Sequence, residues 1–207
     1  MAPAGIRSWE GYLQARYWVR IAGVMGTLKL EPAQTRTDLL AGPVAKALTV
    51  WPEDAPIDAD QVMVAPIDAE LADTAAFCEA YDVGLDVSAN CVIVAGKRDG
   101  ETRYAACIVL ATTRADVNGV VRRRLNVRKC SFAPMEDAVR ITGMEYGGIT
   151  PIGLPVDWPI LVDSRVAATP HVIIGSGVRH SKIAIAGPAL GALPGAEVIE
   201  DLAKPIG

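Results

Sequence analysis

The run Gly143–Pro155 has the residue types of a ligand-binding loop. It holds four glycines and two prolines in thirteen residues. Glycine allows positive φ and close backbone approach, while proline fixes φ and lacks an amide donor, so the run is neither a helix nor a central strand. Its apolar residues, such as Tyr146, Ile149 and Leu154, argue against a solvated linker. The run is interpreted either as a buried structural turn or as a pocket wall whose backbone groups face a ligand.

A second candidate is the turn Gly175–His180, which contains G-x-G but not the third glycine of a dinucleotide-binding fingerprint. No long helix is expected after it, so a dinucleotide site is not predicted. A Ser164, Asp163 and His180 triad lacks a supporting G-x-S-x-G motif and is not predicted either. Asp163 is interpreted as a strand-end cap or a polar group of a pocket, and His180 as an exposed turn residue or a pocket residue.

The histidines and cysteines do not predict a metal site or a cofactor. The chain has two histidines and no H-E-x-x-H motif. Its four cysteines are far apart without C-x-x-C spacing, which favours reduced thiols and a cytoplasmic protein. Cys91 and Cys107 lie in apolar runs and are expected in the core. The sequence shows neither an apolar run long enough to span a membrane nor a signal peptide.

Charge is distributed unevenly along the chain. The net charge of −4 does not by itself suggest a nucleic-acid partner. Residues 31–87 contain twelve acidic and two basic residues, whereas residues 114–140 contain seven basic and three acidic residues. The basic segment is interpreted as a side that faces an anion or as an ordinary solvated face.

The periodicity of apolar residues and the turn signals predict short helices and strands in close succession. Strands outnumber helices, and several are too close together for helical crossovers, so the expected class is mixed α/β with a curved, mostly antiparallel or mixed sheet. A single domain is expected over residues 25–207, preceded by an aromatic-rich extension over residues 1–24. The predicted helices are one over 36–50 that begins near Pro43, one capped by Asp68 that ends near 81, one over 113–125 capped by Thr113, one from Pro134 to Gly143, and a helical turn over 188–193. A hairpin is predicted from strands 91–95 and 103–111. Further strands are predicted over 61–66, 128–132, 159–163, 171–175, 182–185 and 196–199.

This order of elements, with Gly147–Pro151 as a G-x-x-x-P loop, Asp163 at a strand end and the Gly175–Arg179 turn, resembles the YbaK/EbsC-like aminoacyl-tRNA editing domains. These domains are relatives of the insertion domain of bacterial prolyl-tRNA synthetase. The resemblance covers roughly residues 68–203. It implies a barrel-like mixed sheet flanked by helices and a trans-editing deacylase of mischarged aminoacyl-tRNA, with the tRNA for proline as the typical substrate.

The resemblance also implies the site residues. The G-x-x-x-P loop would surround the aminoacyl ester without a metal, a cofactor or a protein nucleophile, because ester hydrolysis needs mainly orientation and oxyanion stabilisation. A terminal ribose hydroxyl of the tRNA would help to position water. The implied catalytic residues are Asn90, Gly147, Gly148, Ile149, Thr150 and Pro151; the implied substrate contacts are Asp163, Gly175, Gly177, Arg179 and His180; and Arg122, Arg123 and Arg128 are expected to steer the tRNA backbone.

One position departs from the family pattern. The hairpin of the family typically starts with a lysine, and the aligned residue here is Asn90. Either Asn90 is a polar orienting residue, or the domain is a catalytically degenerate module that binds tRNA or another ligand. A hydrolase of a different small acyl ester is a third interpretation. The expected partners are aminoacylated tRNA and an aminoacyl-tRNA synthetase, without DNA or a membrane.

Overall fold

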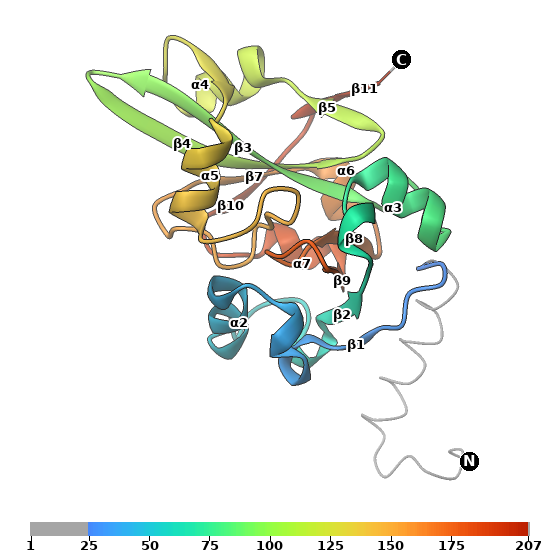
Figure 1. Ribbon diagram of the computed structural model, residues 1–207. Coiled ribbons are helices and arrows are strands. Elements are labelled where there is room, and N and C mark those ends of the chain that lie inside the picture. The colour runs from blue at the N-terminus through green and yellow to red at the C-terminus, as the bar shows by residue number, and fades with distance from the viewer. Residues whose placement is uncertain (1–24, 207) are drawn as a thin grey trace, which may run out of the picture.

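The computed structural model describes residues 25–206, which fold into a mixed α/β structure (Figure 1). The extension predicted over residues 1–24 lies outside the described residues. Within these residues six α-helices accompany the sheets: α2 Gly42–Thr49, α3 Thr74–Tyr81, α4 Arg122–Arg124, α5 Met135–Thr142, α6 Ser164–Ala168 and α7 Gly187–Gly191. Within this range no helix is both long and apolar enough to cross a membrane.

The strands form a four-stranded, a five-stranded and a two-stranded sheet. In the five-stranded sheet β7 (Ile160–Asp163) is parallel to both of its neighbours, β10 (Ala196–Ile199) and β4 (Glu101–Leu110). The remaining pairs are antiparallel, which confirms the mixed class. No closed barrel forms within residues 25–206; a bridge between Ser88 and Ile173 joins the two larger sheets. The strand order of the four-stranded sheet is β1 Glu31–Pro32, β2 Met63–Pro66, β9 Ser181–Ile185 and β8 Val172–Gly175. The strand order of the five-stranded sheet is β10 Ala196–Ile199, β7 Ile160–Asp163, β4 Glu101–Leu110, β3 Ala89–Arg98 and β6 Cys130–Phe132. The two-stranded sheet pairs β11 Ala203–Pro205 with β5 Thr113–Ala115.

The predicted hairpin is confirmed and is longer than expected. Its strands β3 and β4 are ten residues each, and Arg98 pairs with Glu101 across a two-residue turn. Asp99 and Gly100 have φ values of 54° and 86°. Positive φ at both central residues is typical of a type I′ turn, whose twist matches that of the flanking strands.

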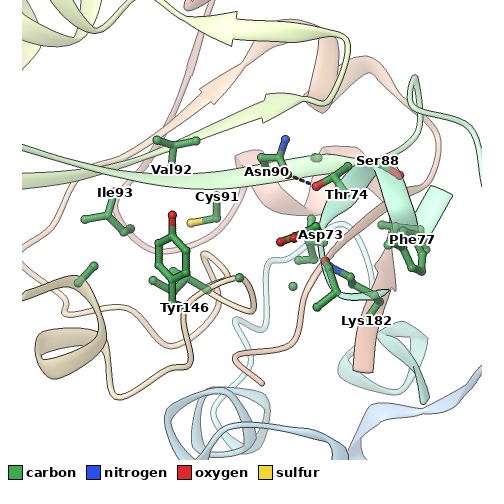
Figure 2. Close-up of a pocket in the computed structure, with 18 of the residues that line it drawn as sticks. Asp73, Thr74, Phe77, Ser88, Asn90, Cys91, Val92, Ile93, Tyr146 and Lys182 are labelled. Atoms are coloured by element: carbon green, nitrogen blue, oxygen red, sulfur yellow. Dashed lines mark hydrogen bonds between the residues drawn. The ribbon is translucent and has the colours of Figure 1, made fainter. Parts of the chain in front are cut away.

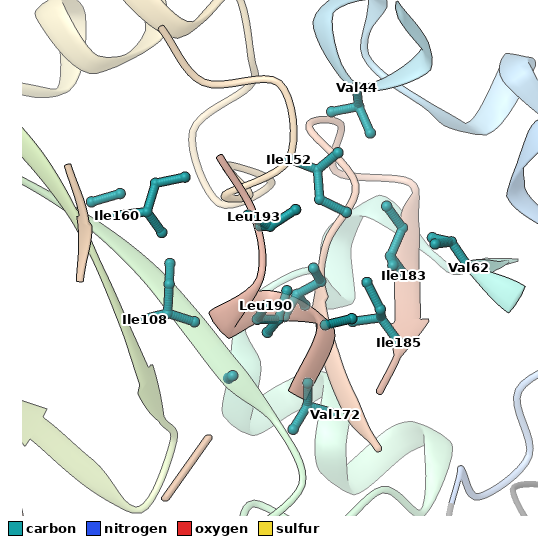
Figure 3. Close-up of a cluster of buried hydrophobic side chains, with 14 of the residues drawn as sticks. Val44, Val62, Ile108, Ile152, Ile160, Val172, Ile183, Ile185, Leu190 and Leu193 are labelled. Carbon is teal, nitrogen blue, oxygen red and sulfur yellow. The ribbon is translucent and has the colours of Figure 1, made fainter. Parts of the chain in front are cut away.

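The two faces of this hairpin pack against different hydrophobic clusters. Ile93 and Ile108 belong to the main core, which Figure 3 shows between the hairpin, α7 and the four-stranded sheet. Val94 and Cys107 belong to a second cluster on the other face. The period-two alternation of a strand assigns neighbouring residues to opposite faces. It therefore also determines which β3 side chains face the glycine loop, residues Gly143–Pro155.

The segment 113–125 differs from the predicted continuous helix. Thr113–Ala115 forms strand β5 and pairs with β11, so helical structure starts only afterwards. The N-cap is Asp116 rather than Thr113, and its carboxylate accepts a hydrogen bond of 3.1 Å from the amide of Gly119. A π turn, η5 (Val117–Val121), then leads into α4. The predicted apolar face is present, because Val117, Val121 and Leu125 are buried.

Helix ends position the glycine loop. Gly143 follows α5 with a φ of 66° and donates its amide to Val139, which redirects the chain into the loop. Met144 and Ile152, near the two ends of the loop, are 2% and 1% exposed. Ile152 lies among the core side chains near Val44 of α2 (Figure 3). The loop is therefore anchored by apolar residues on both sides of its glycines.

Candidate active site

A cavity of about 460 Å³ lies between the hairpin, α3, the glycine loop and β8. Gly147 and Ile149 of the loop line it, together with Asn90 and Cys91 of β3 and Lys182 of β9. Figure 2 shows side chains from these elements converging on this space. The cavity thus brings together chain segments more than ninety residues apart in the sequence, as expected for a built site.

The loop is tied by hydrogen bonds to the turn that follows β8. The Gly177 amide donates to the Gly148 carbonyl at 2.7 Å, and the Glu145 amide donates to the Gly177 carbonyl at 2.8 Å. The Arg179 amide donates to the Glu145 carboxylate at 2.6 Å. These bonds hold the backbone of the loop in one place, which is the condition for a preorganised site.

Glycine is required sterically where the two segments touch. A Cβ on Gly148 would lie 2.5 Å from the carbonyl oxygen of Val178, and a Cβ on Gly175 would overlap the carbonyl oxygen of Gly148. Gly147 has a φ of 85°, which side-chain-bearing residues rarely adopt. The glycine pattern therefore serves close backbone packing at the cavity wall.

Gly147 and Ile149 are among the wall residues whose backbone amides have no partner within residues 25–206. Within residues 25–206 no hydrogen-bond acceptor is found for the amides of Gly147 and Ile149, whereas the Gly148 amide donates to Glu145. Both residues line the cavity. Free amide donors at the wall of a cavity can bind an oxygen atom of a ligand.

The second half of the loop faces elsewhere. Thr150 is fully buried, lines neither cavity described here, and has a hydroxyl without a hydrogen-bond partner in the described part of the chain. Pro151 lines a second cavity of about 540 Å³, which also contacts α2 and Leu154. This second cavity is walled almost entirely by apolar side chains, with Lys46 as its charged lining residue among those described.

Asn90 lines the first cavity, at its α3 end. Its side-chain oxygen accepts a hydrogen bond of 2.7 Å from the Thr74 hydroxyl. In Figure 2, Asn90 and Val92 lie on one side of β3, while Cys91 and Ile93 lie on the other side, towards Tyr146 of the loop. Cys91 is thus the polar β3 side chain directed at the loop, a role that the sequence analysis did not assign.

The thiol of Cys91 is not activated. Burial, and secondarily the neighbouring Cys107, raises the pKa of the Cys91 thiol well above its ordinary value. Burial likewise raises the pKa of Cys107 to about 12. Cys91 is therefore protonated at neutral pH. It is a poor nucleophile because the thiolate is the nucleophilic form of cysteine. All four cysteines are free.

Two charged residues that line the cavity, Asp73 and Lys182, were not predicted from the sequence. Asp73 immediately precedes α3, and Lys182 lies in β9 with 7% of its surface exposed. Burial lowers the pKa of the Lys182 ammonium. Its ammonium donates to the Ala72 carbonyl at 2.8 Å and lies 5.3 Å from the centroid of the Phe77 ring. The available signal was a lysine at the start of an otherwise apolar strand, a position that normally excludes charge.

Of the other predicted substrate contacts, some line the cavity and some lie outside it. Gly175 lines the cavity, whereas Gly177, Arg179 and His180 do not. The Arg179 guanidinium instead connects the loop to η4 (Ala69–Leu71), because it donates to the carbonyls of Tyr146 and Ala69. His180 is exposed, with its ring nitrogen 3.4 Å from the carbonyl oxygen of Asp38.

Asp163 lies outside both cavities. It is 1% exposed and caps α6, where its carboxylate accepts from the Arg165 amide at 3.0 Å. It also accepts from the Ala203 amide at 2.8 Å. Of the two interpretations of Asp163, the geometry matches the strand-end cap.

The predicted tRNA-contacting arginines lie on the surface near α4. Arg122, Arg123 and Arg128 are exposed and do not line the cavity. The neighbouring Arg124 forms an ion pair with Glu197. In the described residues no group of three or more His, Cys, Asp and Glu side chains is placed to hold a metal ion.

Comparisons with known proteins agree with this architecture. The family described as the aminoacyl-tRNA editing domain matches residues 68–193. A candidate trans-editing enzyme for prolyl tRNA synthetase superposes with a TM-score of 0.64 at 21% identity, covering 77% of this chain and 94% of the other. A scaffold used for computational epitope grafting gives 0.64 at 20% identity, covering 77% and 95%. These structures share the fold, and the family match shows that the chain belongs to the aminoacyl-tRNA editing domain family.

Proposed function

We propose that this protein hydrolyses the ester bond of mischarged aminoacyl-tRNA in the cavity walled by Gly147 and Ile149. The observation that carries the proposal is that the amides of Gly147 and Ile149 have no acceptor within residues 25–206, on a loop fixed against the 175–179 turn. Membership of the editing-domain family supports the substrate class. In the reaction, the oxygen of water bonds to the carbonyl carbon, the bond to the ribose oxygen breaks, and a proton passes from water to that oxygen.

The site residues suit a reaction without a covalent enzyme intermediate. Cys91, whose side chain points towards Tyr146 of the loop in Figure 2, is held protonated by burial. Loop amides can instead donate to oxygen atoms of the bound ester, where negative charge develops during attack by water. A terminal ribose hydroxyl of the substrate is available to position that water, as the family resemblance implies.

The proposed tRNA is that for proline, and a synthetase that charges it would be the natural partner. The similar structure described as a candidate trans-editing enzyme for prolyl tRNA synthetase supports this choice. The decisive experiment is a deacylation panel of tRNA for proline charged with alanine, cysteine or proline. We expect hydrolysis of at least one mischarged form and sparing of the correct one. A panel without any hydrolysis would contradict the proposal.

We further propose that Arg122, Arg123 and Arg128 contact the tRNA backbone. Each is exposed and free to meet a phosphate. Replacing one of them by alanine should weaken tRNA binding and reduce the slope of log affinity against log salt by about 0.7 to 0.9, the contribution of one phosphate contact. Filter-binding titrations at several salt concentrations measure this slope, and unchanged slopes in all three variants would exclude the role.

A catalytically degenerate binding module is the second candidate, favoured by one observation. Asn90 carries no charge, and the Thr74 hydroxyl already occupies its side-chain oxygen. Under this alternative the wild type binds uncharged and charged tRNA but hydrolyses neither, and Asn90→Lys creates activity. Under the deacylase proposal the wild type is active and Asn90→Ala reduces its rate.

A further inference from the structure

The first cavity has one basic and one acidic lining residue among those the structure describes. Lys182 is the base and Asp73 is the acid. Figure 2 shows both at the α3 end of the cavity, close to Thr74. Lys182 is buried, whereas Asp73 is exposed at the rim. The cavity therefore offers opposite charges at different depths.

The Lys182 ammonium can donate further hydrogen bonds to a ligand. An ammonium carries three N–H donors, and within residues 25–206 Lys182 has one hydrogen-bond acceptor, the Ala72 carbonyl. It forms no ion pair with Asp73 within 4.0 Å, although that carboxylate acts on it electrostatically. Buried charges are normally paired, so a desolvated ammonium beside open space favours an incoming oxygen atom.

The Asp73 carboxylate is also available. Asp73 occupies the N-cap position of α3, yet its side chain makes no capping hydrogen bond. Its carboxylate has no ion pair in the described part of the chain. A carboxylate at the rim of a cavity attracts a cation, whereas the buried ammonium of Lys182 repels one. A cationic group of a ligand is therefore favoured at Asp73.

We infer that the cavity recognises an aminoacyl group with a free α-ammonium: Asp73 binds that ammonium, and Lys182 donates to the carbonyl oxygen of the ester. This inference rests on the proposed function. It adds that an ester whose α-amino group is blocked is a poor substrate. Lys182 would act in the transition state, because the carbonyl oxygen gains negative charge as water attacks.

The test compares one aminoacyl-tRNA with its N-acetyl derivative, which lacks the charge of the α-amino group and carries an added acetyl group. We expect the wild type to prefer the free form by about tenfold or more, since loss of a charge-assisted contact has at least that effect. Asp73→Asn should reduce the preference to near unity. Asp157→Asn, at an exposed position outside both cavities, should leave the preference unchanged.

Lys182→Met should slow hydrolysis of both esters by about 100-fold without changing the preference, in the range expected for removal of an oxyanion-stabilising donor. Lys182→Arg should recover part of the rate because it keeps the charge. Circular dichroism checks folding. If Lys182→Met fails to fold, the substrate preference of the wild type and Asp73→Asn decides the inference. A wild-type preference that Asp73→Asn does not alter, or a folded Lys182→Met variant with unchanged rates, would overturn it.

Failure of the proposed function can be told apart from failure of this inference. If the wild type hydrolyses no mischarged tRNA, binding is measured with an adenosine that carries the amino acid through a stable 3′-amide, with and without an N-acetyl group. At least tenfold tighter binding of the free amine would support recognition without catalysis. Equal binding of the two analogues, or binding of neither, would contradict the inference.

Discussion

The two faces of the glycine loop differ in chemistry although they belong to one short segment. Gly147 and Ile149 border a cavity that also holds Asp73, Asn90 and Lys182. From Pro151 onward the loop borders an apolar cavity against α2. The difference shows that the first half of the loop is built around backbone polar groups, while the second half packs and anchors.

This division predicts different consequences for substitutions on the two faces. Changes on the first face should affect turnover through the placement of the loop backbone. Changes on the second face should affect mainly stability, because apolar burial is the interaction lost there.

The largest effect is expected for Gly148→Ala. A Cβ at this position would lie 2.5 Å from the Val178 carbonyl oxygen, so the loop and the 175–179 turn must separate. A displacement of about 1 Å at a site that works by orientation can reduce the rate about 100-fold. Single-turnover deacylation assays measure this. Gly42→Ala is the matched control, because a Cβ there meets no atom within 4 Å, and its rate should equal that of the wild type.

Leu154→Ala probes the second face. Leu154 packs partly buried against the main core and lines the apolar cavity. Its truncation should lower the free energy of unfolding by about 1 to 2 kcal/mol, below the range for fully buried leucines, and change the deacylation rate by less than about threefold. Urea denaturation and the deacylation assay measure the two quantities. A large rate loss with unchanged stability would break the contrast between the faces.

Thr150→Val tests the residue between the faces. The buried Thr150 hydroxyl has no partner within residues 25–206, and an unsatisfied buried polar group costs about 1 to 3 kcal/mol. Valine has nearly the same shape without the hydroxyl, so the variant should be about 1 kcal/mol more stable. Thermal unfolding of both proteins provides the comparison. A destabilised variant would indicate that the hydroxyl has a partner.

The smallest effect concerns the pH dependence of stability. The pKa of Lys182 is lowered from 10.5 in the folded state, mainly by burial. Between the two pKa values the unfolded chain binds more protons, so the Lys182 contribution to stability rises with pH and levels off above 10.5. The difference in unfolding free energy between wild type and Lys182→Met should therefore increase towards alkaline pH. A constant difference from pH 7 to 11 would contradict a desolvated ammonium.

Local sequence signals predicted the parts of the fold that depend on local interactions. The Asp99-Gly100 turn and the Gly143 helix end follow from positive φ, and Pro43 marks the first turn of α2. The prediction of a continuous helix over 113–125 was partly wrong. Strand β5 pairs with β11, about ninety residues away, and that pairing overrides helical periodicity. Helix α6 was not predicted, although its N-cap Asp163 was interpreted from the sequence as a strand-end cap or a pocket group.

The candidate site was only partly predictable for the same reason. The glycine loop was identifiable from its composition, and Gly175 was identified from the resemblance. Lys182 and Asp73 reach the cavity only through the pairing of β9 with β8 and the placement of α3, neither of which a local pattern encodes. The direction of the Cys91 side chain depends on strand register, where a shift of one residue reverses the face.

The central claim is that the substrate binds on the Gly147 face of the loop and not on the Leu154 face. The most direct test is amide chemical-shift mapping with the stable 3′-amide analogue of aminoacyl-adenosine. We predict saturable shifts at Gly147, Ile149 and Gly175, with Gly153 and Leu154 unaffected. Shifts centred on Leu154 and α2, or none at Gly147 under saturating analogue, would contradict the account.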